Sequence, residues 1–512
     1  MRRSRIFVCF SFSDDRGGHL TGWADFGIIN RMKTNALMMI AAAALAGSAF
    51  AEPFATADFT QRTGKLNKWL HCSSWAPRSY PRGLVKDDDL LKPLRLTAFR
   101  THDAPLVNNG QRIIDTQYMF PLMHLDAKDP KNYLFEPTDH WLELGRNMGM
   151  KVFYRMGTSI EHTGDWGFNT LNPPDHAKYA EVLAGIVRHY TRGWANGKKW
   201  DILYWELFNE PDVPPCWRGT EEEFIDLFVT CLKRLKGEFP ELKVGGPAMG
   251  WYNEPYFRKL FEACKAAGVK PDFASWHSYS QDLPKLIEQP AKMRKLCDEY
   301  GFTDTELILN EWHYLISWDG IQAASSPDMV VRAQEGVTGI KNIDSAVFTV
   351  SALARFQDTC LDQSYYYGSG FNGNWGYVDN YRRFAKVYYA MKMNGDLVND
   401  FSEKVKCAYD ASGNKTAFGA WSADGKTACL IVADYRGTDQ ILEVAVKGLD
   451  GAKRVTATVL DNDRDCLDCP VEFRNGKVRL TKAERRSAAF MVTFELQAVE
   501  TFLQSDKKYA TM

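Results

Sequence analysis

Residues 200–212 read WDILYWELFNEPD, a stretch in which an apolar run reaches a carboxylate just as the chain turns polar. Residues 201–208 are rich in Ile, Leu, Tyr and Trp, which predicts a buried strand of a parallel sheet. Asn209 and Glu210 then lie at the carboxyl end of the strand, and Pro211 ends it. In a (β/α)8 barrel the active site is assembled at this end of the strands. Glu210 is therefore a candidate catalytic residue.

A second stretch has the same build. Residues 306–310, ELILN, form a short apolar run, and Glu311 follows at its end with Trp312 beside it. Two carboxylates at the ends of two barrel strands suggest acid/base and nucleophilic work on one bond.

Short apolar runs alternate with helical patterns along much of the chain, as repeated βα units require. We expect eight strands, at residues 68–75, 94–100, 151–156, 201–208, 243–247, 272–276, 306–310 and 344–350. Helical spacing predicts helices over 138–147 and 174–194, and a capping box at Thr220 and Glu223 opens another that runs to about Phe239. The predicted fold class is α/β, a (β/α)8 TIM barrel over residues 52–395.

Residues 396–512 have a different pattern. Period-two apolar runs at 416–421, 428–433, 441–446 and 489–496 are separated by turn sequences at 412–414, 424–425 and 475–476. This pattern predicts a C-terminal antiparallel β-sandwich domain. Because it holds no carboxylate-rich or His-rich cluster, we expect it to serve packing or the edge of a substrate site.

Residues 32–51 have the pattern of a secretory signal peptide. Lys33 supplies the positive start, residues 36–46 an apolar segment and residues 49–51 a small-x-small cleavage site. The alternative is a buried N-terminal helix. The apolar segment is too short for a stable membrane span. We therefore expect a secreted or periplasmic protein, and interpret residues 1–31 as an extension upstream of the true start.

The composition narrows the class of partner. The 63 basic and 64 acidic residues nearly balance, so no global field attracts nucleic acid or an anionic membrane. Aromatic residues make up 13% of the chain, which suits sugar recognition although most are expected in the core. The cysteine spacings predict no disulfide pairing, and nothing in the sequence predicts an oligomeric state. Cys466 and Cys469 form a lone CxxC, for which a local disulfide or two free thiols is favoured over zinc.

The two glutamates suit cleavage of a glycosidic bond. Cleavage with retention needs one carboxyl to protonate the leaving oxygen and a carboxylate about 5–5.5 Å away to attack the anomeric carbon. A neighbouring anion raises the pKa of a carboxyl group, so each of Glu210 and Glu311 helps to set the other's role. No metal or cofactor is needed.

Other residues at predicted strand ends can support this chemistry. Asn209 is placed to donate to a sugar 2-hydroxyl, and Arg100 and Tyr279 to hold Glu311 ionised. Three tryptophans are candidate platforms for a sugar face: Trp205, Trp312 and Trp375. Taken singly, His102 and His277 are more often structural histidines than ligands. The conjunction favours function, because Glu210, His277 with Tyr279, and Glu311 fall at the ends of predicted strands four, six and seven.

Three motifs resemble those of a known family. WELFNEPD (205–212), FASWHSYS (273–280) and LILNEWHY (307–314) are similar to the strand-four, strand-six and strand-seven motifs of clan A glycoside hydrolases, most closely family 39, which contains β-xylosidases and α-L-iduronidases. FRTHDAPL (99–106) resembles the strand-two motif, and the resemblance covers residues 63–393. It implies Glu210 as acid/base and Glu311 as nucleophile. It also implies a set of supporting or sugar-binding residues: Asn209, His277, Tyr279, Arg100 and His102.

The chain departs from the family pattern near the expected glycone pocket. Phe208 stands where the family has tryptophan, and the aromatic and acidic pair of strand eight is replaced by Phe348 and Ala352. The sequence therefore predicts the mechanism and not the sugar. An iduronidase needs a basic clamp for the substrate carboxylate. Arg155 is a candidate, although a salt bridge within the barrel is the use we favour.

Two functions remain. The first is a secreted, retaining glycoside hydrolase that cleaves a poly- or oligosaccharide by double displacement. The second is a carbohydrate-binding barrel with little or no turnover. Two carboxylates held against each other's repulsion serve no purpose in a binding protein, so we favour the enzyme.

Overall fold

The computed structural model describes residues 9–13, 19–23, 52–74, 91–102, 113–158, 170–214, 216–318, 339–368, 375–378 and 383–496. It divides into two units, Met1–Glu52 and Pro53–Met512. In the first unit, β1 (Cys9–Ser13) and β2 (His19–Trp23) pair antiparallel. Apart from these two strands, the predicted upstream extension at residues 1–31 lies outside the described residues. The predicted signal peptide at residues 32–51 also lies outside them.

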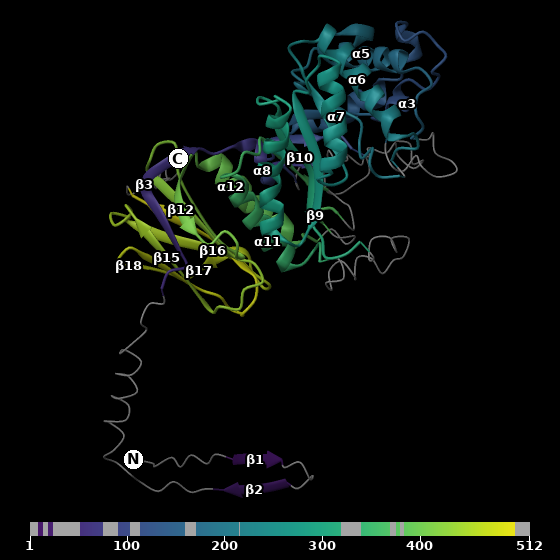
Figure 1. The fold of residues 1–512 in the computed structure, drawn as a ribbon. Coiled ribbons are helices and arrows are strands. Elements are labelled where there is room, and N and C mark those ends of the chain that lie inside the picture. Colours follow the sequence, from purple (N-terminus) through teal and green to yellow (C-terminus); the bar gives the residue numbers. More distant parts are fainter. Residues whose placement is uncertain are drawn as a thin grey trace, which may run out of the picture. The chain divides into compact units, whose positions relative to one another are not determined.

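Eight parallel strands close into a barrel in the order β10-β11-β4-β5-β6-β7-β8-β9 (Figure 1). The strands are β4 (Cys72–Ser74), β5 (Ala98–Arg100), β6 (Lys151–Met156), β7 (Tyr204–Leu207), β8 (Lys243–Met249), β9 (Phe273–Ser280), β10 (Glu306–Tyr314) and β11 (Gln363–Tyr367). The first seven overlap the seven strands predicted before residue 344. The predicted barrel is confirmed.

The eighth predicted strand is wrong. Residues 344–350 lie inside helix α11 (Ile343–Phe356), which begins at Asn342, whose side chain accepts the backbone N–H of Ser345 at 3.0 Å. All residues of α11 except Asp344 are buried. A helix covered on nearly all sides has a continuous apolar sequence, which periodicity alone does not distinguish from a buried strand. The true eighth strand, β11, follows α11 by a short connection.

The predicted helices are present in the barrel unit. The α-helices are α3 (Thr116–Met119), α4 (Glu136–Asn147), α5 (His176–Arg192), α6 (Glu221–Glu238), α7 (Glu254–Ala266), α8 (Leu283–Glu299), α11 and α12 (Lys386–Asp400). Short 3-10 helices are η1 (Lys68–Leu70), η2 (Lys92–Leu94), η3 (Pro130–Asn132) and η5 (Trp194–Asn196). The capping box that predicts α6 is formed in both directions between Thr220 and Glu223. No helix of the described residues has the length and apolar character of a membrane span.

A second sheet of ten strands has the order β17-β16-β20-β14-β13-β12-β3-β15-β19-β18. Its strands are β3 (Ala55–Lys65), β12 (Glu403–Tyr409), β13 (Lys415–Trp421), β14 (Thr427–Asp434), β15 (Ile441–Lys447), β16 (Arg454–Leu460), β17 (Asp465–Cys469), β18 (Val471–Arg474), β19 (Lys477–Thr481) and β20 (Ala488–Glu495). All neighbours pair antiparallel except β3 and β15. We expected residues 55–65 in the barrel. They form instead a central strand of this sheet, seen in Figure 1 as the purple strand beside β12.

The second sheet buries both faces. Along β14, Ala428, Leu430 and Val432 point into a core within the sheet domain, whereas the alternate residues join the core of the barrel unit. The rings of Phe473 in β18 and Phe494 in β20 lie 5.3 Å apart although these strands are distant in the sheet order, so the sheet curls around its inner core. This is the sandwich-like arrangement expected from period-two runs. Cys466 and Cys469 are free thiols.

Arg355 at the end of α11 joins the barrel unit to the second sheet. Its guanidinium donates to the backbone carbonyls of Ala411, Gly413 and Lys415, each at 2.8 Å. The side chain is 3% exposed. These bonds satisfy the turn between β12 and β13, which otherwise would face the barrel with open carbonyl groups.

The interior of the barrel has two kinds of layer. The lower layer is mostly apolar and comes from Cys72, Ala98, Phe153, Tyr204, Phe273, Ile308 and Tyr365. Two residues further along the same strands, the inward positions become polar: Ser74, Arg100, Arg155, Glu206, Ser275 and Asn310. Since strand residues two apart share a face, the polar layer lies above the apolar one, toward the carboxyl ends of the strands. The candidate site is built on it.

Candidate active site

Glu210 is placed by a tight turn at the end of β7. Phe208 and Glu210 adopt left-handed backbone conformations, with φ of 75° and 51°. Such φ values are unfavourable for residues other than glycine and are held by their surroundings. The backbone N–H of Glu210 donates to the carbonyl of Ala248 at 2.8 Å, which ties the turn to β8. Gly157 makes room, because a Cβ there would lie 2.8 Å from the ring of Phe208.

Glu311 is placed by an irregularity in β10. The pairing of β10 with β9 shifts register between Leu309 and Glu311. Asn310 therefore points into the polar layer of the barrel, and Glu311 lies opposite His277 above that layer. One inserted residue thus aims two consecutive side chains at one site.

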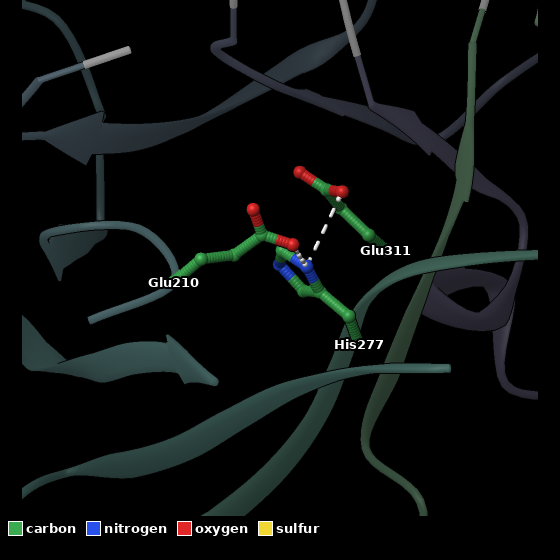
Figure 2. Close-up of side chains that lie close together, drawn as sticks. All are labelled: Glu210, His277 and Glu311. Carbon is green, nitrogen blue, oxygen red and sulfur yellow. Dashed lines mark hydrogen bonds and ion pairs between the residues drawn. The ribbon is translucent and has the colours of Figure 1, made fainter. Parts of the chain in front are cut away.

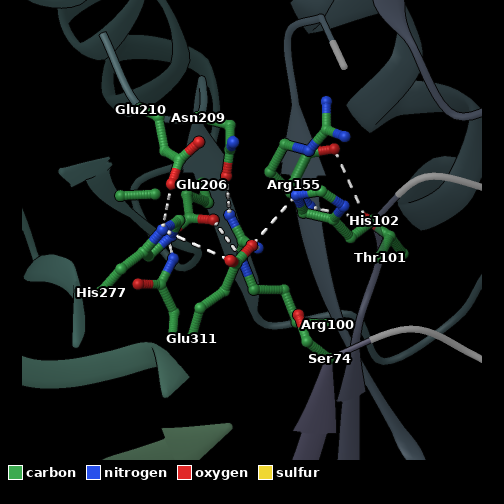
Figure 3. A network of polar contacts seen from close by, with 12 residues as sticks. Ser74, Arg100, Thr101, His102, Arg155, Glu206, Asn209, Glu210, His277 and Glu311 are labelled. Carbon is green, nitrogen blue, oxygen red and sulfur yellow. Dashed lines mark hydrogen bonds and ion pairs between the residues drawn. The ribbon is translucent and has the colours of Figure 1, made fainter. Parts of the chain in front are cut away.

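Donors surround both oxygens of Glu311 (Figure 3). Oε1 accepts from Arg100 at 2.7 Å and lies 3.0 Å from Nε2 of His102. Oε2 accepts from the Tyr279 hydroxyl at 2.7 Å and lies 3.3 Å from Nδ1 of His277. Burial alone would raise the pKa of this carboxyl, but the charges of His277, His102 and Arg100 outweigh it and hold the pKa of Glu311 well below its ordinary value. Glu311 is thus an ionised carboxylate at neutral pH.

Glu210 faces Glu311 across His277 (Figure 2). Nδ1 of His277 lies 2.8 Å from Oε1 of Glu210, and the thiol of Cys216 lies 3.3 Å from Oε2. The Glu210 side chain is 18% exposed, compared with 4% for Glu311. Ligating atoms of Glu210, His277 and Glu311 all lie within 4.8 Å of one another. The two carboxylates predicted from the sequence are therefore brought together, the more exposed one with fewer donors.

The same three side chains have the spacing of metal ligands. However, both oxygens of Glu311 already have two nitrogen or hydroxyl neighbours each, and one of these is the buried Arg100 cation. A metal ion would have to displace these donors and lie close to a fixed positive charge. The donor set fits an ionised carboxylate rather than a metal ligand, and a metal-independent site stays our prediction.

Asn209 lies beside the pair. Its Oδ1 accepts from Arg100 at 2.8 Å, and the residue is 1% exposed. This contact fixes the amide so that its Nδ2 donor faces away from Arg100. A role toward a sugar hydroxyl stays a prediction, as do the substrate-binding roles of His102, His277 and Tyr279.

Aromatic rings cluster next to Glu311. The ring of Trp375 lies 5.4 Å from Tyr279 and 5.3 Å from Tyr367. The ring of Trp318 lies 5.0 Å from Tyr279 and is 46% exposed. Trp375 remains a candidate sugar platform. The sequence analysis did not propose Trp318 or Tyr367. Trp318 follows β10, whose strand was predicted, whereas Tyr367 is the last residue of β11, which was not.

Two predicted platforms are corrected. Trp312 is fully buried and packs edge to face on Phe356 of α11, with ring centroids 5.4 Å apart. Trp205 is fully buried and stacks on Tyr154 at 4.9 Å. Both point outward from the barrel into the layer of helices, because they alternate with the inward Glu206 and Glu311 positions. They offer no face to a ligand.

Four further polar residues complete the site: Glu206, Ser275, Asn310 and Cys216. Glu206 accepts from Arg100 at 2.6 Å, from Ser275 at 2.6 Å and from Asn310 at 2.7 Å. The signal for Glu206 was present in the sequence, as a lone carboxylate inside an apolar strand. Arg155 pairs with Asp115 at 3.2 Å with both side chains buried, which is the salt bridge within the barrel that we favoured.

Comparison with known proteins adds to this geometry. Residues 123–294 match the model of the glycosyl hydrolases of family 39. The chain is 26% identical to a β-xylosidase of Geobacillus stearothermophilus over 143 residues, which are 28% of this chain and 26% of that protein. It is 29% identical to a β-xylosidase of Caldicellulosiruptor saccharolyticus over 162 residues, 30% of this chain and 32% of that protein. These matches span a third or less of the relatives' own length.

Solved structures extend the likeness of the fold. A glucosidase from Croceicoccus marinus superposes with a TM-score of 0.68 at 22% identity, covering 86% of this chain and 98% of that chain. The barrel and the second sheet thus occur together in a known enzyme structure. The sequence motifs and the match over residues 123–294 make this chain similar to the glycosyl hydrolases of family 39, and the structural likeness shows a shared fold.

Proposed function

We propose that this protein is a retaining O-glycoside hydrolase that uses Glu210 and Glu311. The observation that carries the proposal is the approach of the two carboxylates, whose facing oxygens lie within 4.8 Å of each other. Retaining enzymes hold their carboxyl groups about 5–5.5 Å apart, whereas inverting enzymes need roughly 6.5–9.5 Å to admit a water molecule between carboxylate and sugar.

The surroundings of the two glutamates assign their roles. Glu311 is buried among donors that keep it ionised, as a nucleophile requires. Glu210 is more exposed. Its oxygens lie beside Cys216 and beside His277, which it shares with Glu311, whereas Glu311 also contacts Arg100 and His102. A carboxyl with fewer cationic neighbours is better suited to hold and return a proton. Glu210 is therefore the acid/base.

The proposed reaction has two steps. Glu311 attacks the anomeric carbon while the bond to the leaving oxygen breaks, and that oxygen takes the proton of Glu210. The product is a glycosyl ester on Glu311 and an ionised Glu210. Glu210 then removes a proton from water, the hydroxide oxygen attacks the anomeric carbon, and Glu311 leaves as a carboxylate.

The substrate is an oligo- or polysaccharide, reached outside the cytoplasm by way of the predicted signal peptide at residues 32–51. The partly buried rings of Tyr279, Tyr367 and Trp375 suit the apolar face of a sugar. Two relatives are named β-xylosidases, so xylosides are the first substrates to test. Export is tested separately, by asking whether the native host releases the protein into the periplasm or medium with residues 32–51 removed.

The activity test is hydrolysis of nitrophenyl glycosides and polysaccharides by the purified protein and by Glu210→Ala and Glu311→Gln. Glu311→Gln should be inactive. Glu210→Ala should lose most activity on poor leaving groups and less on activated ones, and azide should partly restore the latter. Full activity in Glu311→Gln would refute the assignment of the nucleophile.

The same panel tests the alternative of a carbohydrate-binding barrel. Sugar binding measured by calorimetry, with no turnover on any substrate and no difference between wild type and Glu311→Gln, would favour the binding protein.

A further inference from the structure

We propose that Glu206 is a positioning residue that keeps the Arg100 cation paired while Glu311 is consumed as the nucleophile. The inference rests on the proposed function for its chemistry. It concerns a third carboxylate, which lies one layer below the two glutamates that face the substrate.

Glu206 binds Arg100 where both are completely buried. Oε2 of Glu206 accepts from Nε of Arg100 at 2.6 Å, and both side chains are 0% exposed. The other two nitrogens of the guanidinium donate to Glu311 at 2.7 Å and to Asn209 at 2.8 Å. Arg100 thus has two anionic partners and one neutral partner, and Glu206 is the more deeply buried of the two anions, at 0% exposed against 4% for Glu311 (Figure 3).

Three donors define Glu206 as a carboxylate. Ser275 Oγ accepts the backbone N–H of Ala248 at 2.9 Å, so its own hydrogen is directed to Oε1 of Glu206 at 2.6 Å. Asn310 donates to the same oxygen at 2.7 Å, and Arg100 donates to the other. An ionised carboxylate is a pure acceptor, and these three partners of Glu206 are all donors, one of them the Arg100 cation.

The need for Glu206 follows from the charge changes of the reaction. When Glu311 bonds to the anomeric carbon, it becomes a neutral ester, and its negative charge passes by way of the leaving oxygen and the transferred proton to Glu210. In the described part of the chain the guanidinium of Arg100 bonds to Glu206, Glu311 and Asn209, and not to Glu210. Without Glu206, the intermediate would hold a buried guanidinium with no anionic partner, which is strongly unfavourable. Glu206 keeps that charge neutralised in the free enzyme and in the intermediate.

Glu206 also limits the field of Arg100 on the nucleophile. Glu206 and Glu311 share the Arg100 guanidinium. If Glu206 loses its charge, the positive charge of Arg100 acts on Glu311 without a competing anion. The carboxylate form of Glu311 then gains stability and becomes less ready to attack. Glu206→Gln should therefore lower kcat/KM roughly 100- to 1,000-fold and move the acidic limb of its pH profile to lower pH.

Kinetics on activated aryl glycosides distinguish this role from a loss of packing. In Glu206→Gln, formation of the intermediate should become rate-limiting, so that kcat depends on the leaving group more steeply than in wild type. Glu206→Asp, which keeps the charge, should recover part of the rate. The matched control is Ser275→Ala, which removes a neutral donor from the same oxygen and should leave the pH limb in place. An unmoved limb in Glu206→Gln, or an equal effect of Ser275→Ala, would overturn the proposal.

A stability measurement tests the charge argument without any turnover. Glu311→Gln imitates the neutralised nucleophile, and Arg100 then retains Glu206. Each single variant should lower the melting temperature moderately, whereas Glu206→Gln/Glu311→Gln should lower it by clearly more than the sum of the two shifts, because Arg100 loses both anions. Additive shifts would overturn the inference. An inactive wild type with a cooperative double variant would instead refute the proposed glycosidase and leave the role of Glu206 as the partner of Arg100 supported.

Discussion

A tyrosine that donates to a carboxylate does so only while it keeps its proton. Burial, with the nearby charge of Glu311, raises the pKa of Tyr279 well above its ordinary value. Tyr279 therefore remains a donor to Oε2 of Glu311 throughout the range in which an enzyme is assayed. It stabilises the ionised form of Glu311, the proposed nucleophile, without adding a charge that would have to be neutralised in the proposed intermediate.

Tyr279→Phe removes this hydroxyl donor and keeps the aromatic ring. A hydrogen bond to a charged group contributes about 1.5–3 kcal/mol to the stability of the ionised form. Because the ionised form of Glu311 loses a donor, its pKa should rise and the acidic limb of the pH profile should move to higher pH. The control is Tyr300→Phe, whose hydroxyl donates to Glu262 at 3.2 Å on the surface. An acidic limb that stays in place would contradict this role.

His71 makes the folding of the protein sensitive to acid. One ring nitrogen lies 2.7 Å from the carbonyl of Leu94 and the other 2.9 Å from the amide of Asn394, which suits a neutral ring. Burial lowers the pKa of His71 from 6.5 to about 4. Between these values the unfolded chain binds a proton that the folded chain does not, so the free energy of unfolding should decrease as the pH falls from 6.5 to about 4.

The full effect amounts to about 3 kcal/mol, and His71→Gln should remove it. The measurement is urea unfolding of wild type and variant at pH values above and within this window. The difference between the two proteins at each pH isolates His71 from the other titrating groups. Parallel pH dependences would show that His71 does not titrate in this way.

At the scale of elements, α11 shows where sequence patterns fail. The run VFTVSALA contains β-branched and aromatic residues typical of a strand, and we predicted one. Asn342 caps the run as a helix, and side chains of the barrel and the second sheet cover it on opposite sides, so tertiary burial overrides propensity. β11 was missed because its sequence, QSYYY, is short and begins with polar residues. Where helices have a polar face, as in α5, the 3.6-residue period predicted them correctly.

The same reasoning explains which site residues could be predicted. In the sequence Glu210 and Glu311 each follow an apolar run and an Asn, where polar residues interrupt the run, although β10 continues past Glu311 to Tyr314. Glu206 lies inside such a run, and its role appears only once the alternation places it inward beside Arg100. Trp312 and Trp205 were misjudged, because their proximity in sequence to the glutamates does not reveal that they face the helices.

Asn342→Ala should remove the cap of α11. Loss of a side-chain cap costs about 1 kcal/mol of unfolding free energy. Asn342→Asp keeps an acceptor for the N–H of Ser345 and places a negative charge at the helix start, so it should be close to wild type. Chemical denaturation of the three proteins decides the matter. Equal stabilities of the Ala and Asp variants would mean that burial alone holds the first turn.

At the scale of the whole molecule, the barrel and the second sheet depend on each other. Residues on the barrel-facing side of the sheet, such as Phe418 and Ile431, belong to the same core as the barrel helices. Tyr435 donates to the carbonyl of Gln281 at 2.9 Å. Ion pairs cross the same boundary, from Arg436 to Asp344 at 3.4 Å and from Lys386 to Asp465 at 2.7 Å. We therefore expect the two to unfold in one transition.

Arg355→Met tests this coupling. It leaves the carbonyls of the turn between β12 and β13 buried without their donor, at a cost of about 1–3 kcal/mol for each group left unpaired. Unfolding should occur at lower denaturant, and the signals of the barrel and of the sheet should still change together. Arg192→Met, at a half-exposed arginine of α5, is the control and should change stability little. A sheet that melts first in Arg355→Met, with the barrel intact, would show two independent domains.

The position of β3 near the start of the chain delays its pairing during synthesis on the ribosome. Lys65 ends β3 and pairs with Glu403 at the start of β12, so roughly 340 residues are translated between the two partners. At about 5–20 residues per second, β3 waits unpaired for tens of seconds while the barrel emerges. The second half of β3, TQRTGK, is polar, so this half of the unpaired strand exposes little apolar surface to water. All eight barrel strands are thus synthesised before β3 has β12 to pair with, and folding ends when these two strands pair.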